Sequence, residues 1–162
     1  NGELDRFQAR TELEHIDHMP RSYNRWLVVV MVGLACAAFS RLFGGDWIIF
    51  GITFTASAVA MVLRQELAHR HFNPLLVVVA CAFVAGCLAS TAGLFNLSDQ
   101  PETALAAAVL LLVPGVPLIN AAQDLIRGHM VTGIARGVTG LLISLAIALG
   151  LLLALSLTGV TL

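Results

Sequence analysis

Side chains that can bind an anion or carry a proton follow two prolines in the most apolar half of the chain. The segment VPGVPLINAAQDLIRGH, residues 113–129, places Asn120 and Asp124 four residues apart, on one face of a helix. An amide can hydrogen-bond a carboxylate, and an aspartate at membrane depth is costly when ionised. Arg136 adds a permanent positive charge a short way along the chain. These residue types indicate an anion site in which Asp124 is the candidate proton-coupling residue.

Each charged residue also has a plainer interpretation, which the sequence leaves open. Asp124 and Arg127 form an ordinary solvated pair if residues 118–130 lie flat at the membrane interface. Arg136 either meets an anion or Asp124, or is a positive anchor at the cytoplasmic end of its span. Arg41, near the outer end of the first span, either attracts a carboxylate or complements a helix dipole with its head in water.

Patterns typical of enzymes or metal sites are missing from the sequence. It contains no GxSxG, HExxH or Walker A pattern. His69 and His71 form an HxH pair without the further ligands that zinc requires. Cys36, Cys81 and Cys87 lie in apolar blocks without CxxC spacing, which is typical of packing residues. We therefore expect no enzyme, no cofactor and no metal.

A break is expected in the helix that carries the polar residues. Pro114 and Pro117 have no amide hydrogen to donate, and Gly115 between them makes a break easier. At about 1.5 Å per residue, the break lies about 18 Å into a hydrocarbon layer about 30 Å thick. Non-helical backbone at that depth is tolerated when protein buries it or when it lines a cavity, as in many transporters. We therefore predict a central substrate site over residues 113–128, where Asn120 and the amides after Pro117 hold an anion. A simple proline kink is the alternative.

Composition identifies the elements that must position this site. Hydrophobic residues make up 58% of the chain and charged residues 12%. In soluble domains, hydrophobic residues make up about half of the chain and charged residues about a quarter. The net charge of −1 provides no basic stripe for nucleic acid. The apolar blocks predict an all-α polytopic membrane domain over residues 23–162, with five transmembrane helices of which the fourth is broken. The expected spans cover residues 26–43, 47–63, 74–95 and 102–128, and a stretch within 131–160.

The polar start of the chain and the distribution of arginine predict its orientation. Residues 1–22 are expected to form a cytosolic juxtamembrane helix that ends before Pro20. Because the chain starts with Asn1, we expect this helix to be the end of a domain that lies upstream. Nearly all arginines lie at the amino end or in loops on one side, with Arg41 opposite. They are Arg6, Arg10, Arg21, Arg25, Arg64, Arg70, Arg127 and Arg136. That side is predicted to be cytoplasmic, and five spans then put the carboxyl terminus in the periplasm.

Three segments, in this order, resemble the threonine/serine exporter (ThrE) family. They are RWLVVVMVGLACAAFSRLFGGDW, LRQELAHRHFNP and PGVPLINAAQDLIRGHMVTGIAR, and the resemblance covers residues 20–158. Within the family, the two-component succinate exporters of enterobacteria are the closer match. The residues that match the family motif at the break are Pro114, Gly115, Pro117, Asn120, Asp124, Gly128 and Arg136.

The resemblance implies an inner-membrane exporter subunit that works with a second, smaller membrane subunit of the YjjB type, in a homo- or hetero-oligomer. The implied substrate is a succinate-type dicarboxylate or, alternatively, threonine and serine. A further alternative is a structural or gating subunit whose partner carries the substrate.

Overall fold

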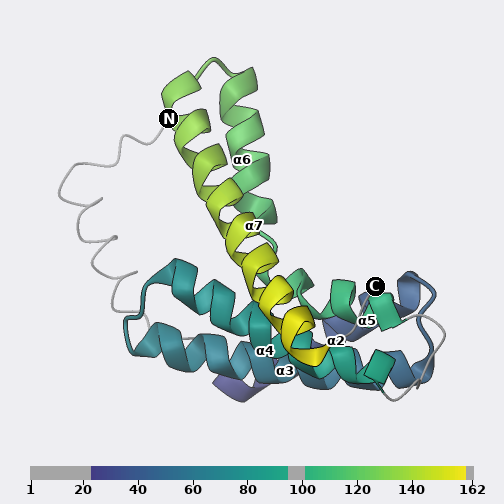
Figure 1. Ribbon diagram of the computed structural model, residues 1–162. Coiled ribbons are helices and arrows are strands. Elements are labelled where there is room, and N and C mark those ends of the chain that lie inside the picture. Colours follow the sequence, from purple (N-terminus) through teal and green to yellow (C-terminus); the bar gives the residue numbers. More distant parts are fainter. Residues whose placement is uncertain (1–22, 95–100, 160–162) are drawn as a thin grey trace.

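The computed structural model describes residues 23–94 and 101–159, and within these ranges the regular structure is entirely helical. The expected all-α membrane fold is confirmed. The expected juxtamembrane helix over residues 1–22 lies outside the described residues. Figure 1 shows helices α2 to α5 lying together, with α6 and the first half of α7 standing away from them as a hairpin.

Three helices precede the break and are long and apolar enough to cross a membrane: α2 (Arg25–Leu42), α3 (Trp47–His69) and α4 (Pro74–Leu94). Two of them begin at asparagine caps. The side-chain oxygen of Asn24 accepts from the Trp26 amide at 3.1 Å, and that of Asn73 accepts from the Leu75 amide at 3.0 Å. Each bond satisfies an amide that has no partner within its helix.

Helix α3 extends to His69, although the sequence placed the end of this span near Leu63. The added residues include good helix formers. Glu66 also accepts from Arg70 at 3.1 Å, a stabilising spacing of four residues, and from Arg25 of α2 at 3.3 Å. Arg64 therefore lies within α3, and the ion pair of Glu66 with Arg25 joins the end of α3 to the start of α2.

The fourth element is broken, as expected. It consists of α5 (Pro101–Ala108), the 3-10 turn η1 (Leu110–Leu112) and α6 (Gly115–Ile126). The axes of the two halves differ by 64°. The described residues thus contain four helices able to span a membrane, or five if the bent pair is one span.

The last helix, α7 (Met130–Thr158), packs on α6 with its first half. A Cβ atom on Gly140 would lie 2.6 Å from Leu118, and one on Gly133 would lie 2.7 Å from Leu125. These pairs run in opposite directions along the two helices, so α6 and α7 are antiparallel. A Cβ at either glycine would force the opposing leucine side chain to move, and close approach at glycines is common between membrane helices.

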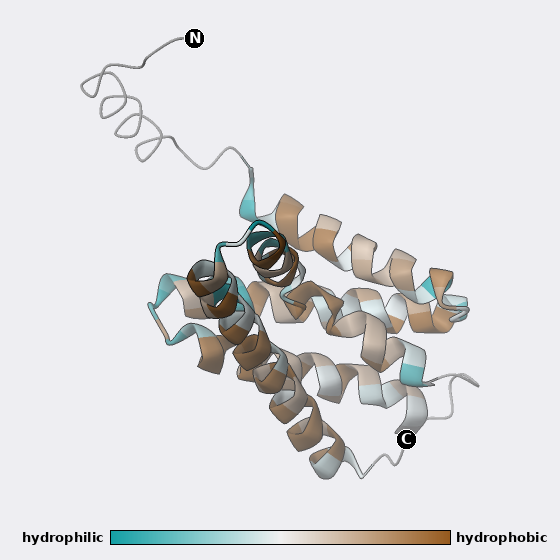
Figure 2. Ribbon diagram, turned by 90° about the horizontal axis from the view of Figure 1, so that it is seen from above, coloured by the Kyte–Doolittle hydropathy of each residue, from teal (hydrophilic) through white to brown (hydrophobic). Residues whose placement is uncertain are grey.

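The second half of α7 packs on α4, again through a glycine. A Cβ on Gly150 would lie 2.6 Å from the carbonyl oxygen of Val79. Alanine fills much of the core around α3, α4 and α5, including Ala56, Ala85 and Ala104, which are fully buried. Figure 2 shows hydrophobic residues along the helices and hydrophilic residues gathered at helix ends and loops. This distribution is that of a multi-pass membrane protein.

Candidate functional site

The break is confined to two residues, Val113 and Pro114. The turn η1 ends at Leu112, and α6 begins at Gly115. Pro114 has φ −80° and ψ 55°, outside the helical region. Pro117, which the sequence also assigned to the break, lies in the first turn of α6, where a proline is tolerated because that amide needs no helical partner. Pro114 therefore interrupts the helix, and Pro117 belongs to the start of the next one.

Two backbone amides at the start of α6 are hydrogen-bonded to carbonyl oxygens just before it. The Leu118 amide donates to the Pro114 carbonyl at 3.2 Å, and the Gly115 amide donates to the Val113 carbonyl at 2.9 Å. The sequence analysis assigned an anion to the amides after Pro117, and the first of these, the Leu118 amide, already has an acceptor in the Pro114 carbonyl. An anion at this position must be held mainly by side chains.

A cavity of about 380 Å³ lies between α6 and α7, beside the break. We call it the Arg136 cavity, and its lining residues are Val116, Pro117, Asn120, Ala135, Arg136 and Thr139. Asn120 and Arg136 supply hydrogen-bond donors, while the Thr139 hydroxyl donates to the Ala135 carbonyl at 2.9 Å. The volume and mixed lining suit a small organic molecule. Of the predicted site residues, Pro117, Asn120 and Arg136 are thus brought together.

Asp124 is joined to this cavity through Arg136. Its carboxylate accepts a hydrogen bond from the Arg136 guanidinium in an ion pair between α6 and α7. The Asp124 side chain is 16% exposed and that of Arg136 is 49% exposed, so the aspartate is the better shielded partner. The alternative pair with Arg127 is not formed within the described part of the chain. Asp124 therefore faces α7, whereas Gln123 and Arg127 on the same helix are exposed.

A second cavity, of about 260 Å³, adjoins the break and contains Arg64. This Arg64 cavity is lined by Arg64, Val78, Ile143 and residues 111–117, which include the predicted site residues Pro114 and Gly115. The Arg64 guanidinium donates to the Leu111 carbonyl at 3.2 Å. Val116 and Pro117 line both cavities.

The sequence did not identify Arg64 as a site residue, because Arg64 was used there only as one of the positive charges that predict the cytoplasmic side. Its contact joins residues 47 positions apart, so it depends on how α3 packs beside α5 and η1. The one local signal is that this arginine ends a long apolar run, AVAMVLR.

Arg41 is not brought to the break. Its guanidinium donates to the Gly45 carbonyl at 2.6 Å and lies 4.6 Å from the centre of the Trp47 ring. It lines neither the Arg136 cavity nor the Arg64 cavity. These contacts hold the turn between α2 and α3, which agrees with the structural interpretation of this residue.

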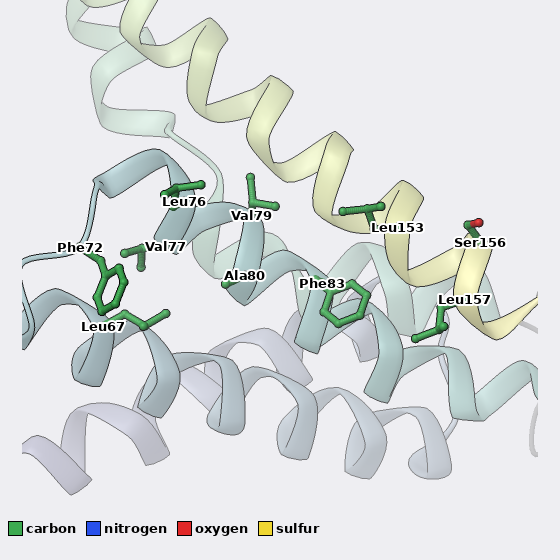
Figure 3. Close-up of a pocket in the computed structure, with 10 residues that line it drawn as sticks. All are labelled: Leu67, Phe72, Leu76, Val77, Val79, Ala80, Phe83, Leu153, Ser156 and Leu157. Carbon is green, nitrogen blue, oxygen red and sulfur yellow. The ribbon is translucent and has the colours of Figure 1, made fainter.

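A third cavity, of about 780 Å³, is almost entirely apolar. Figure 3 shows its lining side chains, which come from the end of α3, from Phe72 in the following loop, from α4 and from the last turns of α7. Ser156 supplies the one hydroxyl group among them, and none carries a charge. This cavity therefore lacks the donors that a carboxylate needs.

Comparison with known proteins identifies the family to which the chain belongs. A family profile described as putative threonine/serine exporter matches residues 1–158. The chain belongs to the threonine/serine exporter (ThrE) family. This membership agrees with the helices that are long and apolar enough to cross a membrane.

Two enterobacterial relatives are similar over most of the chain. It is 46% identical over 141 residues to the probable succinate transporter subunit YjjP of Escherichia coli, covering 86% of the chain and 55% of that protein. The protein of the same name from Klebsiella aerogenes is 45% identical, with the same coverage. The chain spans about half the length of these relatives.

A more distant relative is the probable threonine/serine exporter of Mycobacterium tuberculosis. It is 27% identical over 154 residues, which cover 95% of the chain and 28% of that protein. No solved structure matches the chain.

Proposed function

We propose that this chain is a subunit of a secondary transporter in the bacterial inner membrane that exports a small carboxylate, of the succinate-type dicarboxylate class. The observation that carries the proposal is the Arg136 cavity, which lies beside the break at Val113 and Pro114. A broken helix next to a polar cavity is how many transporters hold their substrates. The name of the enterobacterial relatives, probable succinate transporter subunit, supports the substrate class.

Arg136 is the proposed binding group for a substrate carboxylate. Its guanidinium has five N–H donors, and one nitrogen bonds to Asp124. Arginine binds carboxylates through two parallel hydrogen bonds, which fixes the orientation of the bound acid. Asn120 lines the same cavity and supplies an amide N–H donor.

The Asp124 and Arg136 pair supplies a route to proton coupling. A substrate carboxylate that binds Arg136 competes with Asp124 for the same guanidinium. Once displaced, the Asp124 carboxylate is left without a partner in a shielded position, which favours its protonation. The substrate carboxylate then takes the place of the Asp124 carboxylate beside Arg136. When the substrate leaves, the ion pair of Asp124 with Arg136 forms again and Asp124 releases its proton.

The proposed orientation has a cytoplasmic amino terminus and a periplasmic carboxyl terminus, following the arginine distribution. The proposed partner is a smaller membrane subunit of the YjjB type. Among the described helices, α6 packs chiefly on α7, and Val116 and Ile119 on α6 are largely exposed. The partner would cover this face of the hairpin and close the Arg136 cavity.

Threonine and serine export is the second candidate, favoured by one observation. The adjacent opposite charges of Arg136 and Asp124 would suit the carboxylate and ammonium groups of an amino acid. A structural or gating role, in which the partner alone carries the substrate, is the alternative from another class.

The test is efflux from proteoliposomes that contain the full-length protein together with its partner subunit, loaded with succinate or with threonine. We expect succinate efflux, and we expect Asn120→Ala and Arg136→Gln to raise its half-saturation constant. Arg70→Gln is the matched control, because Arg70 pairs with Glu66 away from the break. Efflux by the partner alone would support the structural role, and threonine efflux without succinate efflux would support the amino acid.

A further inference from the structure

We infer that Arg64 forms a second anion subsite at the break, so that the site binds one carboxylate at Arg136 and another at Arg64. The inference rests on the proposed function and deepens it, because two subsites select acids that carry two carboxylates.

The direction of the Arg64 side chain is the first argument. At about 1.5 Å per residue from Trp47, Arg64 lies about 26 Å along α3, close to the far edge of a hydrocarbon layer about 30 Å thick. An arginine at such a boundary usually extends its guanidinium into the nearby water. Here the guanidinium donates to the Leu111 carbonyl, in the turn that precedes the break. Although Arg64 is exposed, its guanidinium is therefore held beside the break.

The lack of a counterion is the second argument. Over residues 23–94 and 101–159, no carboxylate lies within 4.0 Å of the Arg64 guanidinium. Arg25 and Arg70 share Glu66, and Arg136 has Asp124. The carbonyl of Leu111 occupies only one nitrogen of Arg64. The remaining N–H donors of Arg64 are suited to a carboxylate.

The arrangement of the two cavities is the third argument. Val116 and Pro117 line both the Arg64 cavity and the Arg136 cavity, so the cavities meet at the first turn of α6. Val78 and Ile143 give the Arg64 cavity apolar walls. Apolar walls suit the methylene groups of a small diacid, while the two arginines suit its ends.

The matched probe is succinamate, in which a neutral amide replaces one carboxylate of succinate at nearly the same size. Inhibition of labelled succinate efflux by unlabelled succinate and by succinamate is measured with the full-length protein and its partner subunit, in vesicles of zwitterionic lipid. We expect the wild type to prefer succinate by about tenfold or more, since a charge-assisted hydrogen bond contributes about 1.5–3 kcal/mol and 1.4 kcal/mol is tenfold. Arg64→Gln should abolish this preference, Arg64→Lys should restore part of it, and Arg70→Gln should leave it unchanged.

Several outcomes would overturn the inference. If Arg64→Gln keeps the preference of the wild type, Arg64 only satisfies the Leu111 carbonyl, and the proposed function stands without the second subsite. If the defect of Arg64→Gln appears only when anionic lipid is added, the anion is a lipid phosphate. If the wild type binds neither acid, the proposed function fails and the second subsite fails with it. Should Arg64→Gln fail to assemble, Arg64→Met is measured in its place, and a preference equal to that of the wild type in this uncharged variant would also contradict the inference.

Discussion

The carboxylate of Asp124 on α6 and the guanidinium of Arg136 on α7 form an ion pair that ties the half-helix after the break to the helix beside it. The pair lies next to the Arg136 cavity, since Arg136 belongs to both. A change in the charge of Asp124 must therefore alter the binding group that the cavity presents to an anion.

Replacing Asp124 with asparagine keeps the shape of the side chain and removes the group that takes up a proton. We expect Asp124→Asn to leave the complex assembled but to abolish the dependence of succinate efflux on a proton gradient. The measurement is efflux from proteoliposomes with and without an imposed pH difference. A pH dependence identical to that of the wild type would exclude Asp124 as the coupling residue.

The two prolines should differ in their effect on transport. Pro114→Ala supplies an amide that can donate to the Leu110 carbonyl and continue the helix, whereas Pro117→Ala changes a first-turn position of α6. We expect Pro114→Ala to reduce efflux strongly and Pro117→Ala to retain most of it. Efflux assays on matched amounts of assembled protein would show this, and equal losses in both variants would contradict the assignment of the break to Pro114.

The fold was largely predictable because membrane spans follow from local sequence. About 20 apolar residues are needed to cross the bilayer, and Asn24 and Asn73 mark where two of the helices begin. The break was predictable because Pro114 cannot donate a hydrogen bond. The extension of α3 to His69 was missed, because it is favoured partly by the tertiary pair of Glu66 with Arg25.

The site was only partly predictable. Asn120 and Asp124 follow from helical periodicity, and the sequence already offered Asp124 as one possible partner of Arg136. The choice of Arg136 over Arg127 depends on the antiparallel packing of α6 on α7, which no local pattern specifies. The role of Arg64 depends in the same way on the packing of α3 near η1.

The contact between α4 and α7 should be sensitive to a single methyl group. Gly150→Ala would place a Cβ 2.6 Å from the Val79 carbonyl oxygen and from Ala82, so backbone must shift. We expect a loss of about 1–3 kcal/mol in the free energy of unfolding. Gly51→Ala is the control, because its Cβ would meet nothing within 4 Å and should stabilise α3 by about 0.5–1 kcal/mol. Thermal unfolding in detergent measures both, and a Gly150→Ala variant as stable as wild type would refute the close packing.

Arg41 should contribute to stability rather than to binding. Arg41→Ala removes the hydrogen bond to the Gly45 carbonyl and the contact with Trp47, at a cost of about 1–2 kcal/mol. The half-saturation constant for succinate should not change, because Arg41 lines neither cavity at the break. A raised constant in correctly assembled protein would return Arg41 to the list of substrate-binding residues.

The most direct test of the central claim is the accessibility of the Arg136 cavity to water and substrate. Ala135→Cys places a thiol in this cavity, whereas Leu149→Cys places one on an exposed apolar face of α7. Wild-type protein gives the background, since Cys36 and Cys81 are buried but Cys87 is only partly buried. In the assembled complex, we predict that a water-soluble thiol reagent modifies Ala135→Cys much faster than Leu149→Cys, and that succinate slows this modification. Equal rates at the two positions, or a rate at Ala135→Cys that succinate does not change, would contradict a substrate site at the broken helix.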